Sequence, residues 1–423
     1  MPPEPTLPAW LAYLERLHPT AIELGLDRVR IVRDRLGLQR LPFPVFTVGG
    51  TNGKGSTCAL LEAFLRCAGY NVGCYTSPHL VRYNERVRIG GEPAADADLV
   101  RAFERVEAAR GDVSLTYFEF GTLAAALLFV DARVECAVLE VGLGGRLDAV
   151  NVFDTDCAVV TSIGLDHTDY LGPTREHIGY EKAGIFRAGR PAVVSEPEPP
   201  QRLLEHAREC GAELFLIDRD FGAHAGEREW SWWSAQGRRS GLPWPNLRGA
   251  HQLRNASAAL AALETLRARV PVDMGAVRRG LVEVQLPGRF QVLPGRPVRV
   301  LDVAHNPQAA AQLGENLAQM GRFPATIAVF SMLRDKDIAG VVRALQDQVE
   351  RWFIAPSAGS RGIDADGLRD ALRAAGVHDG VQAFASVAEA WAAAQEAAGP
   401  DDRIVAFGSF LTVGAVLEAT RSA

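Results

Sequence analysis

The string GGTNGKGST, from Gly49 to Thr57, constrains the fold of this chain more than any other feature. It follows the apolar run PVFTVGG, overlaps the helical pattern STCALLEAFLRCAG and is succeeded by a second apolar run, NVGCYTS. Two runs of strand length around a helical pattern predict one βαβ unit, with the glycines in the turn before the helix. Backbone N–H groups of such a loop, with the helix N-terminus, form a cradle for phosphate oxygens.

The loop also carries side chains suited to a bound nucleotide. Lys54 can reach the terminal phosphates, and Ser56 or Thr57 can bind the magnesium ion. The pattern departs from the standard GxxxxGK[ST] loop, because Val48 stands at the first glycine position and Gly55 follows the lysine. A tight glycine turn with one exposed lysine is the alternative. The flanking strand and helix favour nucleotide binding.

Strand-like and helical segments alternate along most of the chain. VECAVLEVGLGG, CAVVTSIG and PAVVSE predict further strands, whereas residues 218–250 predict hairpins or loops, and HQLRNASAALAALETLRA predicts an amphipathic helix. The Pro- and Gly-dense string LPGRFQVLPGRP interrupts this rhythm. Beyond it, helical patterns separate the runs VRVLDVAH, TIAVFSML, RWFIAP, VQAFAS and RIVAFGS. We therefore predict an α/β protein with mostly parallel sheets and two domains, 1–287 and 298–423, joined by a linker at 288–297.

Composition excludes several functional classes. The 423 residues suffice for two or three domains of about 150 residues each. Lys and Arg number 45 against 51 Asp and Glu, and the resulting net charge of −6 argues against nucleic acid or a membrane as partner. No apolar run reaches the roughly 18 residues of a transmembrane helix, and the start MPPEPTLPAW does not resemble a secretory signal. The six cysteines form no CxxC pair, which predicts reduced thiols, no zinc site and a cytoplasmic protein.

Three polar residues stand at the ends of predicted strands of the first domain. Glu140 ends the run CAVLE, where a carboxylate can bind Mg²⁺ directly or through water. Asp166 and His167 end the strand predicted for CAVVTSIGLDH, at the sheet edge where ligands bind in open α/β sheets. A solvated edge carboxylate and a hydrogen-bonded structural histidine are the alternatives. The phosphate loop in the same domain favours metal binding for Glu140.

The second domain offers Asp302 and His305 in the string LDVAHNP. The aspartate could accept hydrogen bonds from a ribose, and the imidazole could meet a phosphate or a substrate carboxylate. An Asp-Asn-Pro turn accounts for Asn306 and Pro307 but less well for the aspartate and the histidine. Arg289, in the predicted linker, could close over a nucleotide.

Together, and in their order, these motifs resemble those of the folylpolyglutamate synthases, a branch of the ATP-dependent Mur-type amide ligases. Within this branch, the chain resembles the bifunctional dihydrofolate synthase/folylpolyglutamate synthases of bacteria. The resemblance runs from about Trp10 to Leu411 through the strings LERLHPTAIELGLDRV, GTNGKGST, TSPHLVRYNERVRI, TYFEFGTLAA, LEVGLGGRLDAVN, TSIGLDHTDYLG, IGYEKAGIFR, LPGRF, DVAHNP, MLRDKD and FGSFLTVG. It implies a P-loop-containing ATPase domain of the Mur-ligase type with a parallel sheet, and a smaller Rossmann-like α/β C-terminal domain.

The resemblance also implies roles at matching positions. The ATP contacts are Thr51, Asn52, Gly53, Lys54, Gly55, Ser56, Asn255, Arg289 and Asp302. The magnesium ligands are Ser77, Glu140 and His167. The pteroate contacts are Ala21, Ile22, Glu23, Leu24, Thr116, Tyr117, Phe118, Glu119, Leu147, Asp148 and Ala149. Lys182 matches a lysine that is carbamylated in the family, and Lys54, His167, Lys182 and His305 are the expected catalytic residues.

The implied reaction joins L-glutamate to dihydropteroate and to reduced folates. The carboxylate attacks the γ-phosphate of ATP, and the amine of glutamate then displaces phosphate from the acyl phosphate. The expected cofactors are ATP and Mg²⁺, with a monovalent cation as an optional addition, and the expected state is a cytoplasmic monomer. A peptidoglycan-precursor ligase, a monofunctional folylpolyglutamate synthase and a P-loop switch module are the alternatives.

Overall fold

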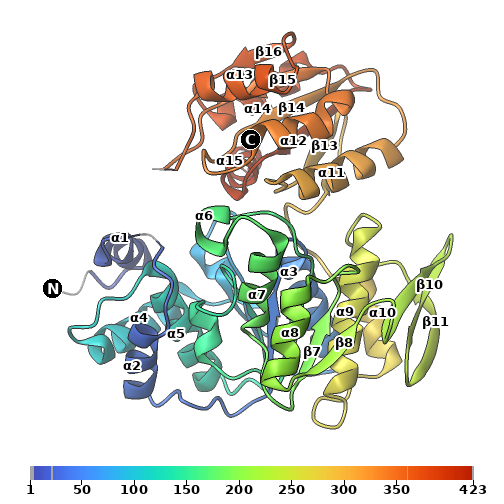
Figure 1. Cartoon of the computed structure of the whole chain (residues 1–423). Helices are drawn as coiled ribbons and strands as arrows, with labels where there is room; N and C mark the ends of the chain where they lie inside the picture. Colours follow the sequence, from blue (N-terminus) through green and yellow to red (C-terminus); the bar gives the residue numbers. More distant parts are fainter. Residues whose placement is uncertain (1–3, 21, 360, 422–423) are drawn as a thin grey trace. The chain divides into compact units, whose positions relative to one another are not determined.

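The computed structural model describes residues 4–20, 22–359 and 361–421. The chain divides into two compact units (Figure 1). The first comprises Met1–Asn246 and Gln252–Gln285, and the second comprises Leu247–His251 and Leu286–Ala423. Part of the predicted linker has regular structure, because residues 291–293 hydrogen-bond as an edge strand of the second unit.

An eight-stranded sheet organises the first unit, in the order β4-β3-β2-β5-β1-β6-β7-β8. Its strands are β1 (Val45–Gly49), β2 (Val72–Tyr75), β3 (Val87–Ile89), β4 (Glu92–Pro93), β5 (Cys136–Glu140), β6 (Cys157–Val160), β7 (Pro191–Val194) and β8 (Glu213–Leu216). All neighbours from β2 to β8 pair in parallel, whereas β3 and β4 add an antiparallel edge. The predicted parallel sheet is confirmed.

The order of the strands reverses at β1. The chain passes from β1 to β2 on one side of the sheet, and from β6 to β7 and β8 on the other. Val48 of β1 pairs with Glu140 of β5, and Gly49 pairs with Val160 of β6. Such a reversal leaves a crevice beyond the carboxyl ends of the strands, where open α/β sheets bind their ligands. The segments that follow β2, β5, β1 and β6 therefore meet at one edge.

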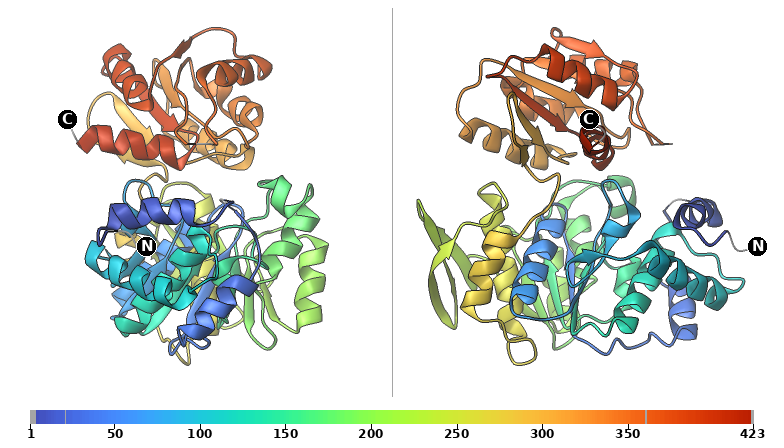
Figure 2. Two further views of the ribbon diagram at one scale, coloured as in Figure 1. Left: turned by 90° about the vertical axis from the view of Figure 1, so that its left-hand side faces the viewer. Right: turned by 180° about the vertical axis from the view of Figure 1, so that it is seen from behind.

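Helices cover both faces of this sheet (Figure 2). They are α1 (Leu7–Leu17), α2 (Asp27–Arg35), α3 (Lys54–Cys67), α4 (Asp96–Arg110), α5 (Tyr117–Asp131), α6 (Thr168–Leu171), α7 (Arg175–Ala183), α8 (Gln201–Cys210), α9 (His251–Thr265) and α10 (Met274–Glu283), with the 3-10 turns η1 (Tyr83–Arg86) and η2 (Ala149–Val152). Helices α3, α9 and α10 lie on one face, and α4, α5, α7 and α8 lie on the other.

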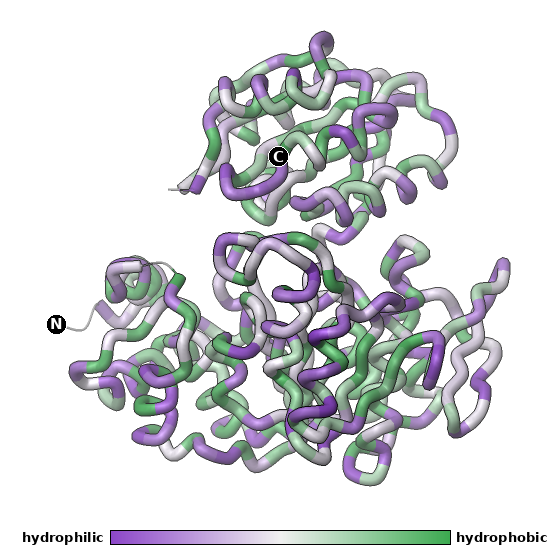
Figure 3. Tube along the Cα trace, in the orientation of Figure 1, coloured by the Kyte–Doolittle hydropathy of each residue, from purple (hydrophilic) through white to green (hydrophobic). Residues whose placement is uncertain are grey.

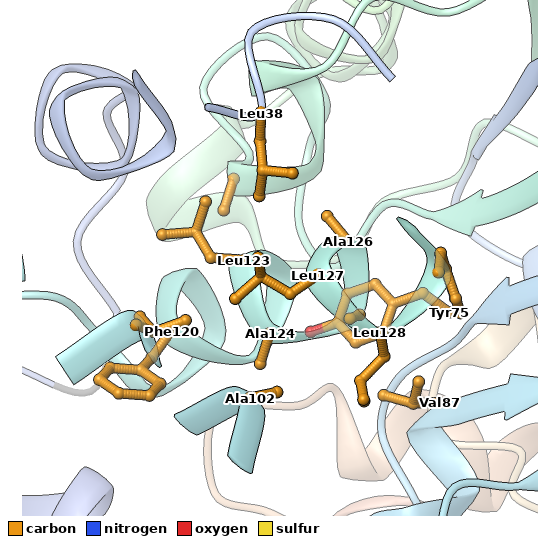
Figure 4. Close-up of a cluster of buried hydrophobic side chains, with 14 of the residues drawn as sticks. Leu38, Tyr75, Val87, Ala102, Phe120, Leu123, Ala124, Ala126, Leu127 and Leu128 are labelled. Carbon is orange, nitrogen blue, oxygen red and sulfur yellow. The ribbon is translucent and has the colours of Figure 1, made fainter. Parts of the chain in front are cut away.

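Apolar side chains from α5 form the centre of a large core (Figure 4). Phe120, Leu123 and Leu127 pack there beside Tyr75 of β2, and each is at most 1% exposed. Full burial of such a side chain contributes about 1.5–3 kcal/mol to folding. Hydrophobic residues dominate β7, whereas helix α8 beside it carries mostly hydrophilic residues (Figure 3).

One of the two predictions for the end of the first unit is confirmed and the other needs correction. The hairpins predicted for 218–250 are confirmed, since β9 (Phe221–Ala225), β10 (Glu229–Ser234) and β11 (Gly237–Pro243) form an antiparallel sheet that includes the buried Trp230 and Trp232. Helix α9 is buried nearly all round and is not amphipathic. Its run of alanines lets neighbouring elements pack closely on every side.

The second unit contains a six-stranded sheet in the order β12-β13-β17-β14-β15-β16. The strands are β12 (Gln291–Leu293), β13 (Val298–Leu301), β14 (Thr326–Phe330), β15 (Arg351–Ile354), β16 (Val381–Ala383) and β17 (Arg403–Phe407). The helices are α11 (Pro307–Gln319), α12 (Ile338–Leu345), α13 (Ala365–Ala374), α14 (Val387–Ala397) and α15 (Phe410–Arg421), with the turn η3 (Gln346–Gln348). Only β12 is antiparallel. The five predicted strands and the α/β architecture are confirmed.

Candidate active site

The glycine-rich loop joins β1 to α3 at the point where the strand order reverses. Gly50 and Gly53 have φ values of +144° and +89°, which side chains rarely allow. A Cβ on Gly50 would also collide with the hydroxyl of Thr161. Helix α3, fourteen residues long, begins at Lys54 directly after this loop, and a helix N-terminus favours an anion.

The segment after β6 holds the loop in place. Thr51 N–H donates to the carbonyl of Ser162 at 2.6 Å, and Asn52 N–H donates to the Ser162 hydroxyl at 3.0 Å. The hydroxyls of Thr161 and Ser162 donate to the Asn52 carbonyl at 2.7 and 3.0 Å. Sequence analysis did not single out this pair of hydroxyls, although their place directly after a buried strand was the available signal. They make the loop a fixed feature of the sheet edge.

Lys54 and Asn255 both lie at the loop. The Lys54 ammonium group donates to the carbonyls of Gly50 and Thr51 at 2.9 and 3.1 Å. Asn255, on α9, packs against Gly53 and donates to the side-chain oxygen of Gln252 at 2.9 Å. Gln252 donates in turn to the Ser56 hydroxyl at 3.4 Å. The structure therefore brings together five predicted ATP contacts, Thr51, Gly53, Lys54, Ser56 and Asn255, and adds Gln252, which the sequence analysis missed.

The predicted magnesium ligands lie at or beyond the carboxyl ends of three strands of the sheet: Ser77 follows β2, Glu140 ends β5 and His167 follows β6. The Ser77 N–H donates to the carboxylate of Glu140 at 3.2 Å, and Glu140 is only 5% exposed. Strand β6 ends at Val160, not at the predicted Asp166 and His167, because the chain turns away to support the phosphate loop. His167 is half-buried with φ of +51°, and its N–H donates to Asp166 at 2.9 Å.

The donor set at this edge suits a hard cation. A serine hydroxyl and a buried carboxylate supply the oxygen atoms that Mg²⁺ and Mn²⁺ prefer, and an imidazole nitrogen is a common ligand of transition metals. The part of the chain that the structure describes holds no cluster of three or more His, Cys, Asp or Glu side chains that could bind a metal. Protein ligands to magnesium are few as a rule, because the ion keeps several waters and substrate phosphates. One serine, one carboxylate and one histidine fit that pattern.

Lys182 is buried in the last turn of α7, with 3% of its surface exposed. Burial, with the positive charge of Lys54 nearby, lowers its pKa to about 7, against the influence of Asp166 and Asp148. Burial raises the pKa of Asp148 to about 7 as well, although Leu143 and Val150 donate N–H bonds to this carboxylate at 2.8 and 2.9 Å. Lys182 and Asp148 both lie within electrostatic range of Lys54.

The predicted pteroate contacts lie on three segments that the structure places together. Gly25, next to Leu24, donates its N–H to the Leu147 carbonyl at 3.2 Å. Arg28 forms ion pairs with both Glu23 and Glu119. Residues 147–149 lead into η2, and 116–119 begin α5. Ala21 is outside the residues that the structure describes.

These residues differ in how exposed their side chains are. Thr116 and Glu119 cap α5 reciprocally and are buried, so their side chains build the helix start. Tyr117 and Phe118 are half-buried, and the Phe118 ring lies 5.9 Å from that of Tyr75. Ile22, Leu24 and Leu147 are half-buried too. The partly exposed apolar and aromatic groups are the ones suited to an aromatic ligand.

In the second unit, Asp302 and His305 follow β13. Phe290 and Ala304 each donate an N–H to the Asp302 carboxylate at 2.8 Å, and burial raises its pKa. The Nδ1–H of His305 donates to the Val303 carbonyl at 2.8 Å. The Arg289 guanidinium lies 4.9 Å from the centre of the Phe410 ring. The segment 288–290 and the end of β13 are therefore close to each other.

Comparison with known proteins gives consistent matches. Residues 48–263 match the model of the Mur ligase middle domain, and residues 288–410 match that of the Mur ligase glutamate ligase domain. The dihydrofolate synthase/folylpolyglutamate synthase of Escherichia coli strain K12 is 47% identical over 413 residues, which cover 97% of this chain and 95% of that protein.

Two solved structures have the same fold over nearly their whole length. One is E. coli FolC in complex with DHPP and ADP, with a TM-score of 0.93, 47% identity and 99% and 98% of the two chains covered. The other is a bifunctional folylpolyglutamate synthase/dihydrofolate synthase with Mn, AMPPNP and L-glutamate bound, with a TM-score of 0.92, 46% identity and 100% of both chains covered. The chain therefore belongs to the dihydrofolate synthase/folylpolyglutamate synthase family of the Mur ligases, which are ATP-dependent amide ligases.

Proposed function

We propose that this chain joins L-glutamate to dihydropteroate, forming dihydrofolate, and also adds glutamate to reduced folates. One observation carries the proposal: the phosphate loop, Ser77 and Glu140 meet at the reversal of strand order, and Lys54 lies there too. The relatives are named for both folate activities, which favours this substrate class over a peptidoglycan precursor. No helix among the described residues is long and apolar enough to span a membrane.

The chemistry follows from the charges involved. The substrate carboxylate attacks the γ-phosphorus of ATP, the bond to the β-phosphate oxygen breaks and ADP leaves. The glutamate amine then attacks the carbonyl carbon of the acyl phosphate, phosphate leaves and the amine loses a proton. A carboxylate approaching a triphosphate meets like charge, so the site must neutralise charge and align the reactants. We assign that work to Lys54, the N-terminus of α3 and the N–H groups of Thr51 to Gly53.

We assign the metal to Ser77, Glu140 and His167, whose donor atoms suit Mg²⁺. The ion would supply further neutralisation of the triphosphate charge. The hydrogen bond from Ser77 N–H to the Glu140 carboxylate keeps the serine and the carboxylate side by side. A monovalent cation is a further expectation to which no residue is assigned.

We propose that Lys182 carries a carbamate. A neutral lysine amine adds CO₂ to give R–NH–COO⁻ and releases one proton. A pKa near 7 leaves a large neutral fraction at physiological pH, which an exposed lysine lacks. The ammonium group has no hydrogen bond or ion pair with any residue that the structure describes. The carbamate would add an anion beside Lys54 and the metal residues.

The remaining assignments concern substrates and assembly. We propose that residues 22–24, 116–119 and 147–149 receive the pteroate, with residue 21 completing the first segment. Asn255, Arg289 and Asp302 would bind ATP, and His305 would act on glutamate or phosphate. Residues 1–287 would form the ATP and pteroate domain, and 298–423 the glutamate-ligating domain. The six free cysteines suit the reducing cytoplasm, and we expect a monomer there.

A coupled assay of ADP release tests the proposed function. ADP should appear only when ATP, magnesium, a pteroate substrate and glutamate are all present, and omission of glutamate should reduce the rate at least about tenfold. An ADP release rate that is the same with and without the pteroate and glutamate would instead indicate a P-loop switch module.

A further inference from the structure

Arg88 lies outside the proposed site, yet it contacts the segment that carries Ser77. It belongs to the edge strand β3 and pairs with Cys74 of β2. Its side chain is 17% exposed, and that of its partner Glu62 is 9% exposed. Two charges so far from solvent carry a desolvation cost that only good geometry offsets.

Every N–H group of the Arg88 guanidinium has an acceptor. Nε and Nη2 donate to the two oxygens of Glu62 at 2.8–3.1 Å, and Nη2 also donates to the Cys74 sulfur at 3.2 Å. Nη1 donates to the Thr76 hydroxyl at 3.1 Å and to the Glu85 carbonyl at 3.0 Å. Because the guanidinium is planar and rigid, its five N–H donors fix the positions of these acceptor groups relative to one another.

Those acceptors lie on two elements of the proposed site. Glu62 lies on α3, the helix that begins at Lys54. Thr76 directly precedes Ser77, and its own N–H donates to the Arg86 carbonyl at 2.9 Å. The Glu85 carboxylate accepts N–H bonds from residues 80–82, at 2.7, 3.1 and 2.8 Å. Hydrogen bonds within the segment 76–86 thus join its two ends, and Arg88 links the segment to α3.

We propose that Arg88, paired with Glu62, is a positioning residue that holds Ser77 for the divalent metal beside the phosphate loop. The inference rests on the proposed role of Ser77 as a metal ligand. Arg88 touches neither substrate nor metal and acts through Thr76. Residues that orient metal ligands in this way change metal affinity by about 10–100-fold when they are replaced.

The test measures Mn²⁺ binding to the full chain with a non-hydrolysable ATP analogue, by the EPR signal of free Mn²⁺. Arg88→Lys keeps the charge but loses the fork, and we expect it to weaken Mn²⁺ binding about tenfold. Glu62→Gln keeps the shape of the side chain but removes its charge, and it should weaken Mn²⁺ binding by a smaller factor. Arg101→Lys is the matched control, because Arg101 forms an exposed ion pair with Asp98 on α4. It should bind Mn²⁺ as the wild type does.

Two further variants separate this inference from the proposed function. Ser77→Ala should weaken Mn²⁺ binding, and Arg88→Lys should add little in the Ser77→Ala background, because both changes act on one ligand. Additive effects in the double variant would overturn the positioning role. Normal Mn²⁺ binding by Ser77→Ala would refute the metal assignment itself, and with it this inference.

The magnesium dependence of turnover is a second readout. A loss of folding would lower kcat at every magnesium concentration, whereas a loss of positioning would not. For Arg88→Lys, the magnesium concentration at half-maximal ligation should rise about tenfold, with kcat at saturating magnesium within about threefold of the wild type. If Arg88→Lys does not fold, the Mn²⁺ affinity and the magnesium dependence of Glu62→Gln test the proposal instead. Wild-type magnesium dependence in the folded variant, or a kcat that saturating magnesium does not restore, would contradict the proposal.

Discussion

A Cβ at Gly53 would lie 2.6 Å from Oδ1 of Asn255, so the phosphate loop and helix α9 meet with no room for a side chain. Gly53 also has a positive φ of +89°. We predict that Gly53→Ala weakens binding of an ATP analogue more than about tenfold and costs about 1–3 kcal/mol of stability.

Gly37→Ala is the control for this prediction. Gly37 has a similar φ of +73°, but a Cβ there would meet nothing within 4 Å. This variant should lose about 1 kcal/mol of stability and keep its affinity for the analogue. Equal affinities of the two variants, measured by calorimetry, would show that the contact with Asn255 does not shape the site.

Lys54→Ala should nearly abolish ligation. It removes the cation closest to the loop carbonyls of Gly50 and Thr51, and losing one charge contact to a transition state costs about 10²–10³ in rate. We expect the variant to fold, because the Lys54 ammonium group lies at the loop and donates to the loop carbonyls of Gly50 and Thr51, outside the hydrophobic core. Near-normal turnover in the ADP assay would refute the phosphate-loop assignment.

Lys182→Ala should be nearly inactive at ordinary magnesium, and acetate should partly restore it. The small carboxylate replaces the anion that the proposed carbamate supplies. Acetate should not stimulate the wild type, which is the control. Electron density that ends at a bare ammonium group, in an active ATP–Mg²⁺ complex prepared with bicarbonate, would contradict the carbamate.

The lowered pKa of Lys182 also predicts how stability depends on pH. Between about 7 and the ordinary value of 10.5, the folded chain binds fewer protons at this residue than the unfolded chain does. The free energy of unfolding therefore rises with pH across that window, and the cost of burying the lysine is fully present below pH 7.

Lys182→Met removes this cost, so it should gain stability over the wild type by more than about 2 kcal/mol at pH 6. The gain should shrink toward pH 10. Urea unfolding in CO₂-free buffer measures it. A difference that does not change between pH 6 and pH 10 would mean that Lys182 titrates normally.

The local pattern of the chain predicted much of this fold. Apolar runs around GGTNGKGST fixed β1, the loop and α3, and the regular alternation after Val298 predicted the second sheet. Packing between distant segments was not predictable in this way. The hydroxyls of Thr161 and Ser162 act on a loop more than a hundred residues earlier, as their contacts with Asn52 show.

The local sequence pattern also could not predict how deeply individual side chains and helices are buried. Lys182 follows Glu181 in a helix and has the sequence of an exposed pair. In the structure only Glu181 is paired, with Arg146 at 2.8 Å, while Lys182 turns inward. Similarly, the alanine-rich sequence of α9 predicts a helix. It does not reveal that neighbouring elements bury this helix along most of its length. Such coverage depends on the tertiary fold.

The most direct test of the central claim is a product assay on the purified full chain. The protein receives ATP, Mg²⁺ and labelled glutamate with either dihydropteroate or tetrahydrofolate, and mass spectrometry identifies the products. We predict dihydrofolate from the first and a tetrahydrofolate extended by one or more glutamates from the second, with one ADP per amide bond. Product from tetrahydrofolate alone would reduce the enzyme to a monofunctional folylpolyglutamate synthase, and amide product from neither substrate would contradict the account.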